Sequence, residues 1–372
     1  MNVEILAVAV LTALATSLVG VFLVLRRLSM LTDAISHTIL LGIVLAFMVV
    51  ADLTSPFLLV AATLMGVVTV FLIEALIQTR RVKEDAAIGV VFTFLFSIAV
   101  IIVTTQFRNV HLDIDMVLLG NLEFVIFDRV MLFDRDLGPA SLWVMAVVLA
   151  INVGLLSVFY KEIKLSTFDP ALASVLGFSA VLMHYGLMTI VSLTAVAAFN
   201  AVGAILVIAL MIGPPITALL FTKTLFHTIV LTLAIATFNS VVGYALAWGL
   251  DVTISGTIAT MTMASFFSAM LLSPKRGLLF EAFRTKKQRE HIALAGLLVH
   301  VENHAESEDA AIELNANTLH EHMNWSRAFC EKIVQRATAQ HYIRLEGNII
   351  KLTETGHAFY RTVVSDSRGT IR

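Results

Sequence analysis

Long apolar runs separated by short polar connections occupy residues 1–280 of the chain. Each run approaches the length of about 20 residues at which a helix crosses a bilayer. The runs fall at 3–25, 33–50, 56–78, 86–106, 141–160, 178–198, 200–221, 225–249 and 254–272. Because 178–221 has almost no polar break, the pattern allows nine spans, or eight spans with one bent or re-entrant helix. The sequence therefore predicts an all-α polytopic membrane domain over 1–280.

A second, smaller domain is expected over 281–372, where the long apolar runs stop. Apolar residues recur there at helical spacing in three segments, 289–304, 318–323 and 326–340. Two short β-prone pieces follow, 342–346 and 349–352, and Gly347-Asn348 between them is a hairpin turn signal. A last helix is expected from Thr353. Three helices followed by a hairpin predict a winged-helix (α+β) domain.

Composition and charge agree with this division and suggest an orientation. The chain is 58% hydrophobic and 14% charged, whereas soluble domains average about 25% charged residues. Residues 1–25 lack a basic stretch before their apolar run, so we expect a retained first helix rather than a signal peptide. Basic residues gather on alternate connections: Arg26, Arg27, Arg80, Arg81, Lys83, Lys161, Lys164, Lys223, Lys275 and Arg276. The positive-inside rule makes this side cytoplasmic, which with nine spans gives an external N-terminus and a cytoplasmic C-terminal domain.

Two further features bear on the compartments. The single cysteine, Cys330, allows no intrachain disulfide, and the C-terminal domain therefore suits a reducing compartment. The long opposite connection, 107–140, is acidic, and its acidic residues are Asp113, Asp115, Glu123, Asp128, Asp134 and Asp136. This connection could attract cations, dock a basic partner, or simply be a solvated loop.

Asp33 and His37 form the most distinctive polar pair of the membrane domain. They are four residues apart in an otherwise apolar run, so they share one helix face one turn apart. Ionisable groups within a membrane are costly and usually line a pathway or pair with something. A carboxylate and an imidazole are ligands for divalent Mn, Fe or Zn, and a second copy of the chain would raise the ligands from two to four. The alternative is a helix-start acid with a hydrogen-bonded histidine.

The connection 161–177 predicts a short, self-contained helix on the cytoplasmic side. Asp169 can act as its N-cap, Pro170 suits the first helical position, and Gly177 suits the far end. Small residues such as Ala173 would allow close docking of another protein, although a plain connecting turn is the alternative. His184 and Asn239 are further polar groups within spans, which could face a pathway but more often join helices in bundles.

The C-terminal domain offers two candidate activities. His300 and His304 share a helix face, with acidic residues after them, and could form a cytoplasmic metal sensor or a merely solvated face. The expected third helix carries Arg327, Lys332 and Arg336 against Glu331, and residues 274–372 hold 14 Lys and Arg against 12 Asp and Glu. Nucleic-acid binding depends largely on phosphate neutralisation, so a nucleic-acid partner has little support and a regulatory or protein-binding role is an equal alternative.

Several stretches together resemble the signature of ABC-transporter permeases for manganese, zinc and iron, the ABC-3 type. They are Gly20 to Arg27, Asp33-Ala34-Ile35-Ser36-His37 with Gly42, the loop with Asp169, Ala173 and Gly177, and the span Val202 to Ala218. The resemblance implies that Asp33 and His37 coordinate the metal, and that the 166–177 segment is the coupling helix seated in a cytoplasmic ATP-binding-cassette ATPase. It also implies a second permease copy or paralogue and an extracytoplasmic metal-binding protein.

The C-terminal domain resembles the winged-helix domain of metal-dependent repressors of the diphtheria-toxin-repressor type, through Leu352-Thr353-Glu354-Thr355-Gly356-His357 and the helices before it. No Gly-x-x-x-x-Gly-Lys-Ser/Thr phosphate loop occurs in the chain, so it is expected to be no enzyme and to leave ATP hydrolysis to a partner. No permanently bound cofactor is expected, because the metal would be the transported substrate.

The leading hypothesis is therefore a multi-pass permease in the cell (inner) membrane that imports a divalent metal. One alternative is a secondary carrier driven by an ion gradient. Such a carrier should have more paired acidic residues in its spans than Asp33 and Glu74 provide. Another is a membrane-tethered metal-responsive regulator with the C-terminal domain as effector. The choice among manganese, zinc and iron stays open, because an aspartate and a histidine suit all of them.

Overall fold

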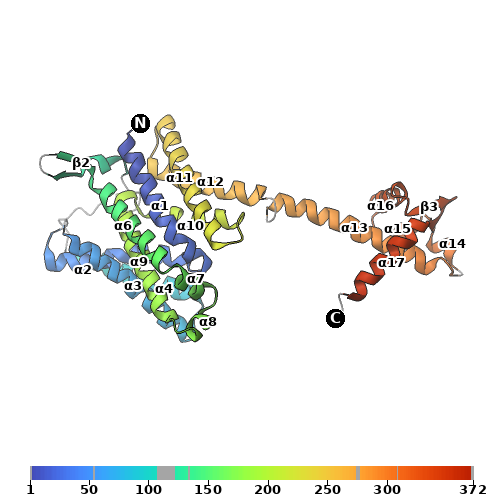
Figure 1. Ribbon diagram of the computed structural model, residues 1–372, viewed down its shortest axis with the longest axis horizontal. Coiled ribbons are helices and arrows are strands. Elements are labelled where there is room, and N and C mark those ends of the chain that lie inside the picture. The colour runs from blue at the N-terminus through green and yellow to red at the C-terminus, as the bar shows by residue number, and fades with distance from the viewer. Residues whose placement is uncertain are drawn as a thin grey trace. The chain divides into compact units, whose positions relative to one another are not determined.

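The chain forms two compact units, residues 1–277 (unit 1) and 278–372 (unit 2). The computed structural model describes residues 2–52, 55–106, 122–132, 135–273, 277–307 and 309–369. Figure 1 shows both units as mainly helical.

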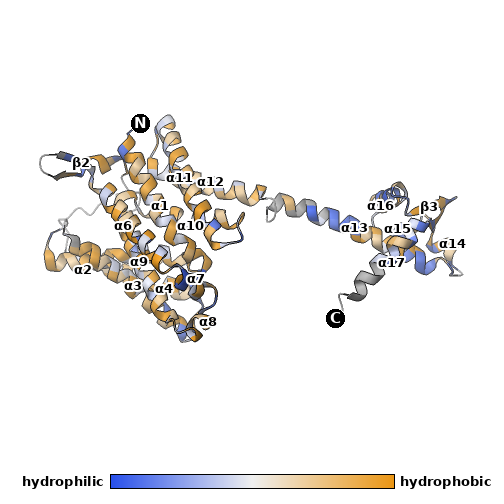
Figure 2. Cartoon of the chain, viewed as in Figure 1, coloured by the Kyte–Doolittle hydropathy of each residue, from blue (hydrophilic) through white to orange (hydrophobic). Residues whose placement is uncertain are grey.

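Unit 1 is a bundle of long apolar helices. Eight of its described helices are long and apolar enough to cross a membrane: α1 (Val3–Leu25), α2 (Ser29–Val50), α3 (Pro56–Gln78), α4 (Glu84–Gln106), α6 (Ala140–Val158), α9 (Ala180–Val202), α11 (Leu225–Leu250) and α12 (Ile254–Leu272). The remaining expected span, 200–221, is the shorter α10 (Ala204–Leu219). Large apolar side chains of these helices are exposed, among them Phe71, Phe94 and Trp248, as expected of surfaces that meet lipid or other apolar partners. Figure 2 shows that apolar residues predominate along the helices of unit 1.

Hydrogen bonds near helix ends establish the relative directions of α1, α9 and α11. At one end of the bundle the Tyr244 hydroxyl of α11 contacts the backbone of Asn2, just before α1. At the other end Arg26, just after α1, contacts His184 near the start of α9. We call these the N-terminal end and the basic end, the latter because Arg26 and Arg27 lie there. Helix α9 therefore runs opposite to α1, toward the N-terminal end.

Helix α10 returns across the bundle in the direction of α1. Gly203, with φ +83°, separates it from α9 in a conformation that favours glycine. The Ser17 hydroxyl of α1 donates to the Leu210 carbonyl, and the Ser273 hydroxyl after α12 donates to the Leu220 carbonyl. The 16 residues of α10 give this helix a length of about 24 Å. This length is less than the roughly 30 Å hydrocarbon core of a bilayer. The described residues thus form eight full-length candidate spans and one shorter apolar helix, α10.

The close approach of α1 and α10 requires a glycine. A Cβ at Gly20 would lie 1.9 Å from the carbonyl oxygen of Met211, an atom of the backbone that cannot rotate away. We therefore expect Gly20→Ala to destabilise unit 1 by about 3 kcal/mol, at the upper end of overpacking costs. Thermal unfolding of the purified chain in detergent measures this. Gly154→Ala is the control, because a Cβ there would meet open space, and an equal melting temperature for the two variants would contradict the packing argument.

The N-terminal end also holds the short elements of unit 1: the 3-10 helix η1 (Leu122–Phe127) and an antiparallel hairpin of β1 (Arg129–Leu132) and β2 (Arg135–Pro139). Arg129 ties this hairpin to α1 through two hydrogen bonds to the Glu4 carboxylate, at 2.9 and 3.1 Å. Its Nε also lies 2.6 Å from Asp136 Oδ2, and this contact lowers the pKa of the Asp136 carboxyl. The hairpin is therefore fixed to the bundle rather than being a free loop.

Unit 2 contains the helices and the hairpin that the sequence predicts. Its elements are α13 (Leu278–His304), α14 (Ala310–Glu313), α15 (Leu319–His322), α16 (Arg327–Ala339), β3 (Ile343–Glu346), β4 (Ile349–Leu352) and α17 (Glu354–Gly369). Strands β3 and β4 pair antiparallel around Gly347, whose φ is +64°. The short α14 was not predicted, and α13 begins earlier than the expected residue 289. Leu297, Leu298, Ile333 and Ile350 are fully buried in a core separate from that of unit 1.

Candidate functional site

Asp33 and His37 face the same way on α2, as their spacing predicts. Asp33 Oδ1 lies 3.5 Å from His37 Nε2, and their side chains are 49% and 30% exposed. Their neighbours Thr32, Ser36 and Thr38 are buried, so the pair lies on the open side of this part of α2. The imidazole stacks against Phe92 and meets the edge of Phe96, both on α4, with ring centroids 5.6 Å apart in each case.

The pair lies in the half of α2 nearer the basic end. Asp33 and His37 are the fifth and ninth residues of α2, which starts at that end. Phe92 and Phe96 are the ninth and thirteenth residues of α4, and thus lie near the middle of that span. A carboxylate oxygen and an imidazole nitrogen are therefore held side by side within the apolar part of the bundle, with room for further ligands on their exposed side.

A polar network at the basic end joins four elements around Arg26. Its guanidinium donates to the hydroxyls of Ser166 and Thr167 on α7 (Tyr160–Phe168), at 2.8 and 3.1 Å. It also lies 3.1 Å from His184 Nδ1 on α9. The other nitrogen of His184 contacts Glu74 on α3, whose second oxygen accepts a hydrogen bond of 2.7 Å from Tyr185. Arg26 is the C-cap of α1, and the short connection that follows it leads into α2. The network therefore connects α7 with the segment that enters the helix carrying Asp33 and His37.

The predicted short helix is present as α8 (Pro170–Val175). The Asp169 carboxylate accepts a hydrogen bond of 2.9 Å from the Leu172 amide, Pro170 occupies the first turn, and Gly177 has φ +87°. These caps confirm the local prediction. Ala173, however, is fully buried against the rest of the unit, so it cannot be a docking contact as the sequence suggested.

The α8 segment also exposes large apolar side chains, which the sequence analysis did not predict. Leu172, Val175 and Leu176 are 44%, 83% and 58% exposed. They lie at the basic end, where α7 also exposes the charged residues Lys161 and Lys164. An apolar surface that is flanked by charges at the end of a bundle, rather than on its lipid-facing side, is typical of a protein-docking site. Helical spacing could have indicated this surface. Leu172 and Val175 are three residues apart and share one face of α8, so they point outward when Ala173 is buried.

The other polar residues proposed for a pathway do not join the pair. His184 belongs to the Arg26 network at the basic end. Asn239 is fully buried on α11, and its amide donates to Ser265 on α12 at 3.0 Å. Helix α11 packs on α1, α10 and α12, whereas Asp33 and His37 lie on α2, which packs mainly on α3 and α4. Asn239 thus makes the interhelical hydrogen bond that the sequence left as an alternative.

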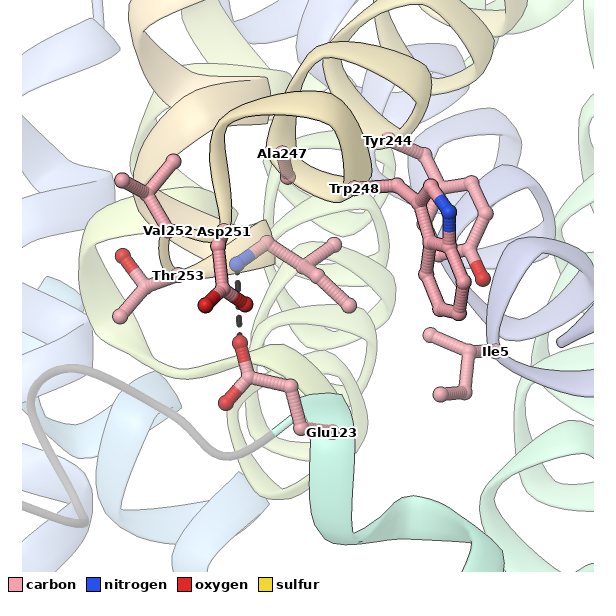
Figure 3. Close-up of a pocket in the computed structure, with 9 residues that line it drawn as sticks. Ile5, Glu123, Tyr244, Ala247, Trp248, Asp251, Val252 and Thr253 are labelled. Atoms are coloured by element: carbon pink, nitrogen blue, oxygen red, sulfur yellow. Dashed lines mark hydrogen bonds between the residues drawn. The ribbon is translucent and has the colours of Figure 1, made fainter. Parts of the chain in front are cut away.

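A pocket of about 990 Å³ opens at the N-terminal end. Figure 3 shows Glu123 reaching from η1 toward the turn between α11 and α12, where its carboxylate accepts a hydrogen bond of 3.0 Å from the Ile254 amide. Asp251 lies beside it, and Tyr244 and Trp248 form the apolar wall with Ile5. Of the predicted acidic connection, Glu123 and Asp136 therefore have partners, while Asp113, Asp115 and Asp134 lie outside the described residues.

In unit 2 the structure brings His300 and His304 together, with ring centroids 4.6 Å apart. The three cations of α16 all contact carboxylates of the same unit. Lys332 and Arg336 both pair with Glu290 of α13, and Arg327 pairs with Glu331. These ion pairs neutralise the surface that a phosphate backbone would have to meet.

A sequence profile of the family described as the ABC 3 transport family matches residues 1–273 of the chain. The chain belongs to this family. It is 45% identical over 289 residues to the manganese transport system membrane protein MntD of Bacillus subtilis, a match that covers 78% of this chain and 98% of MntD. It is 41% identical over 356 residues to the zinc transport system membrane protein TroD of Treponema pallidum, covering 96% of this chain and 97% of TroD. The TroD match therefore extends into unit 2.

A solved structure agrees with the fold of this ABC 3 family member. PsaBC from Streptococcus pneumoniae, determined in complex with a Fab, superposes with a TM-score of 0.62 and 25% sequence identity. The match covers 73% of this chain and 92% of the PsaBC chain. Together with the eight long apolar helices, family membership makes the chain a multi-pass membrane protein of a transport system.

Proposed function

We propose that the chain is the membrane permease subunit of an ATP-binding-cassette importer for divalent transition metals, namely manganese, zinc or iron. The family and the named relatives support the class of transporter. The observation that carries the substrate class is the Asp33–His37 pair, which offers one oxygen and one nitrogen ligand within an apolar bundle. A second acidic residue in the spans, Glu74, is engaged by His184 and Tyr185, which argues against a carrier driven by ion binding to paired carboxylates.

The metal site would be shared between two permeases. Two ligands are too few to hold a metal, and the half-exposed side of the pair leaves room for more. A second copy, or a paralogue, related by a two-fold axis would present the same two ligands and raise their number to four. Such a site can bind and release the metal when the two α2 helices move together or apart.

ATP hydrolysis would act on this site from the basic end. We assign the exposed residues Leu172, Val175 and Leu176 of the α8 segment as the surface that enters the ATPase, with Asp169 and Gly177 as its caps. Movement of α8 and α7 would reach Arg26 through Ser166 and Thr167. Arg26 precedes α2, so the same movement would displace Asp33 and His37.

Arg26→Lys tests this connection. Lysine keeps the charge but cannot replace the guanidinium that contacts Ser166, Thr167 and His184 at once. We expect metal uptake per hydrolysed ATP to fall roughly tenfold, within the usual range of coupling energies, while the ATPase still co-purifies. Arg27→Lys is the control at the neighbouring position. Unchanged coupling in Arg26→Lys would remove Arg26 from the pathway.

The basic end would face the cytoplasm, by the positive-inside rule. The N-terminal end, with the pocket beside Glu123 and Asp251, would then receive the extracytoplasmic metal-binding protein, and unit 2, which follows α12, would be cytoplasmic.

Cells that lack the chain should accumulate less manganese, zinc or iron. Re-expression should restore accumulation only together with an active ATPase partner, and restoration without the ATPase would contradict the proposal.

Unit 2 would be a winged-helix domain with a regulatory role. Its element order of helices followed by the β3–β4 hairpin and α17 supports this assignment. The ion pairs of Lys332 and Arg336 with Glu290 favour a metal or protein partner over DNA. Protection of DNA by the full chain at low salt would support the tethered-regulator alternative instead.

A further inference from the structure

Two histidines of unit 2 lie one turn apart at the end of α13. His300 and His304 are both partly buried, and their ring centroids are 4.6 Å apart. Each imidazole carries two ring nitrogens, and the imidazole nitrogen is a common ligand for divalent transition metals. The two rings are therefore close enough to offer nitrogen ligands to one ion.

A carboxylate from a different element completes the cluster. Glu313, the last residue of α14, places Oε2 3.7 Å from His300 Nε2. One ligand atom from each of His300, His304 and Glu313 can be chosen so that all three lie within 4.8 Å of one another. In a tetrahedral zinc site, ligand atoms are about 3.3 Å apart, from metal–ligand distances of about 2.0 Å. Small side-chain rotations would close this difference.

A fourth group supports the carboxylate. His322, the last residue of α15, places Nδ1 3.1 Å from Glu313 Oε2. It can orient the Glu313 carboxylate, as groups behind metal ligands commonly do, or can serve as a fourth ligand itself. The side chains of His300, Glu313 and His322 are 14%, 27% and 25% exposed, so the cluster is sheltered yet open to solvent ions.

We propose that His300, His304 and Glu313, with His322 beside them, form a binding site for a divalent first-row transition metal in unit 2. The nitrogen-rich set selects ions such as Zn²⁺, Co²⁺ or Fe²⁺ over Mg²⁺ and Ca²⁺, which require mainly oxygen ligands. A simple ion-paired surface needs only one histidine per carboxylate, whereas here three histidines from two helices converge on a single carboxylate.

Metal binding would stabilise unit 2 by joining its helices to its hairpin. The chain that follows Glu313 connects directly to the hairpin, because the Leu314 carbonyl accepts a hydrogen bond of 3.0 Å from the Ile350 amide. A metal held by α13 and α14 would therefore fix β4 relative to the long helix. If the transport function holds, this site would sense the imported metal on the release side, and that regulatory role rests on the proposed function. The site itself does not.

The single cysteine gives a direct readout in the full chain. Cys330 lies on α16 and is 3% exposed, and burial, with a smaller contribution from Glu331, raises the pKa of its thiol. Alkylation therefore requires unit 2 to open. Metal that binds only the folded unit should slow alkylation about tenfold at a free Zn²⁺ concentration ten times the dissociation constant. Zn²⁺ bound at Asp33 and His37 would not protect a thiol in a separate unit.

The comparison is alkylation with and without Zn²⁺ in the full chain, in wild type, in His300→Ala/His304→Ala, and in His341→Asn. His341, with φ +56°, is a histidine of the same unit outside the cluster, and asparagine tolerates its backbone conformation. We expect protection in wild type and His341→Asn and its loss in the double variant. Equal protection in all three chains, or protection in none, would overturn the proposal.

If the double variant folds poorly, Cys330 will be alkylated faster even without metal. A second measurement then tests the site independently. Co²⁺ is added to the full chain carrying Asp33→Ala and His37→Ala, so that the proposed transport site is removed. We expect one Co²⁺ per chain with visible absorption bands, and loss of these bands on adding the isosteric change Glu313→Gln. Absence of Co²⁺ binding, or binding indifferent to Glu313→Gln, would overturn the site. Failed metal uptake in the Asp33 and His37 background would concern only the transport site.

Discussion

Replacing His37 with alanine should reduce metal accumulation roughly hundredfold or more, while the chain still inserts and binds its ATPase. Loss of a group behind a metal ligand already costs about 10- to 100-fold in affinity, and in a two-fold site each substitution removes two ligands at once. Asp33→Ala should have an equal or larger effect, since it also removes the negative charge that offsets the metal. Uptake of radioactive manganese or zinc by cells with equal amounts of each variant measures the effect.

Two controls separate this effect from general damage. His227→Ala removes an exposed histidine of α11 that contacts Thr224, and should leave uptake near the wild-type level. Asp33→Glu keeps the carboxylate but lengthens the side chain, and should retain partial uptake. Wild-type uptake by His37→Ala would show that the metal follows another route.

Replacing Val175 with aspartate should weaken association with the ATPase roughly hundredfold, equivalent to about 2.7 kcal/mol. Val175 is 83% exposed on α8, so the change costs the isolated chain little. In a complex it would place an unpaired charge in an apolar interface, which is strongly unfavourable. Co-purification of the ATPase with the tagged chain, and stimulation of ATP hydrolysis, measure the loss.

Val252→Asp is the matched control for the coupling surface. Val252 is 50% exposed and lies in the turn after α11, at the N-terminal end of the bundle. The same chemical change there should leave ATPase association intact. Equal weakening by both variants would show that neither position is specific, and intact association in Val175→Asp would remove α8 from the ATPase interface.

Local sequence patterns predicted those features that depend on residues close together in the chain. The i, i+4 spacing of Asp33 and His37 was enough to place them on one face of α2. Asp169, Pro170 and Gly177 predicted α8 because capping and turn preferences act over a few residues. The Gly347-Asn348 signal likewise predicted the β3–β4 hairpin.

Features that depend on packing between distant segments could not be predicted. Arg26 reaches Ser166, 140 residues away, and nothing in either local sequence indicates the partner. The burial of Ala173, which reverses its expected role, depends on how α8 docks on its own bundle. His300 and His304 were recognised from their spacing, but Glu313 joins them from α14, a helix that helical periodicity did not indicate.

The short, separate helix α10 could not be predicted from the sequence for a different reason. Apolar composition alone could not separate it from α9, because both stretches are continuous in hydropathy. The break is made by the positive φ of Gly203, and the return of the chain is fixed by contacts of α10 with α1 and α12. An isolated glycine in an apolar run is compatible with a continuous span, so tertiary packing decided the outcome.

In the proposed mechanism, ATP hydrolysis by a partner drives a transition metal past Asp33 and His37. Its most direct test is metal uptake into proteoliposomes that contain the purified chain, its ATPase and its metal-binding protein. We predict uptake that requires ATP, persists when ion gradients are collapsed, and falls to background in Asp33→Ala. Uptake driven by an ion gradient without ATP, or ATP-driven uptake unchanged by Asp33→Ala, would contradict the account.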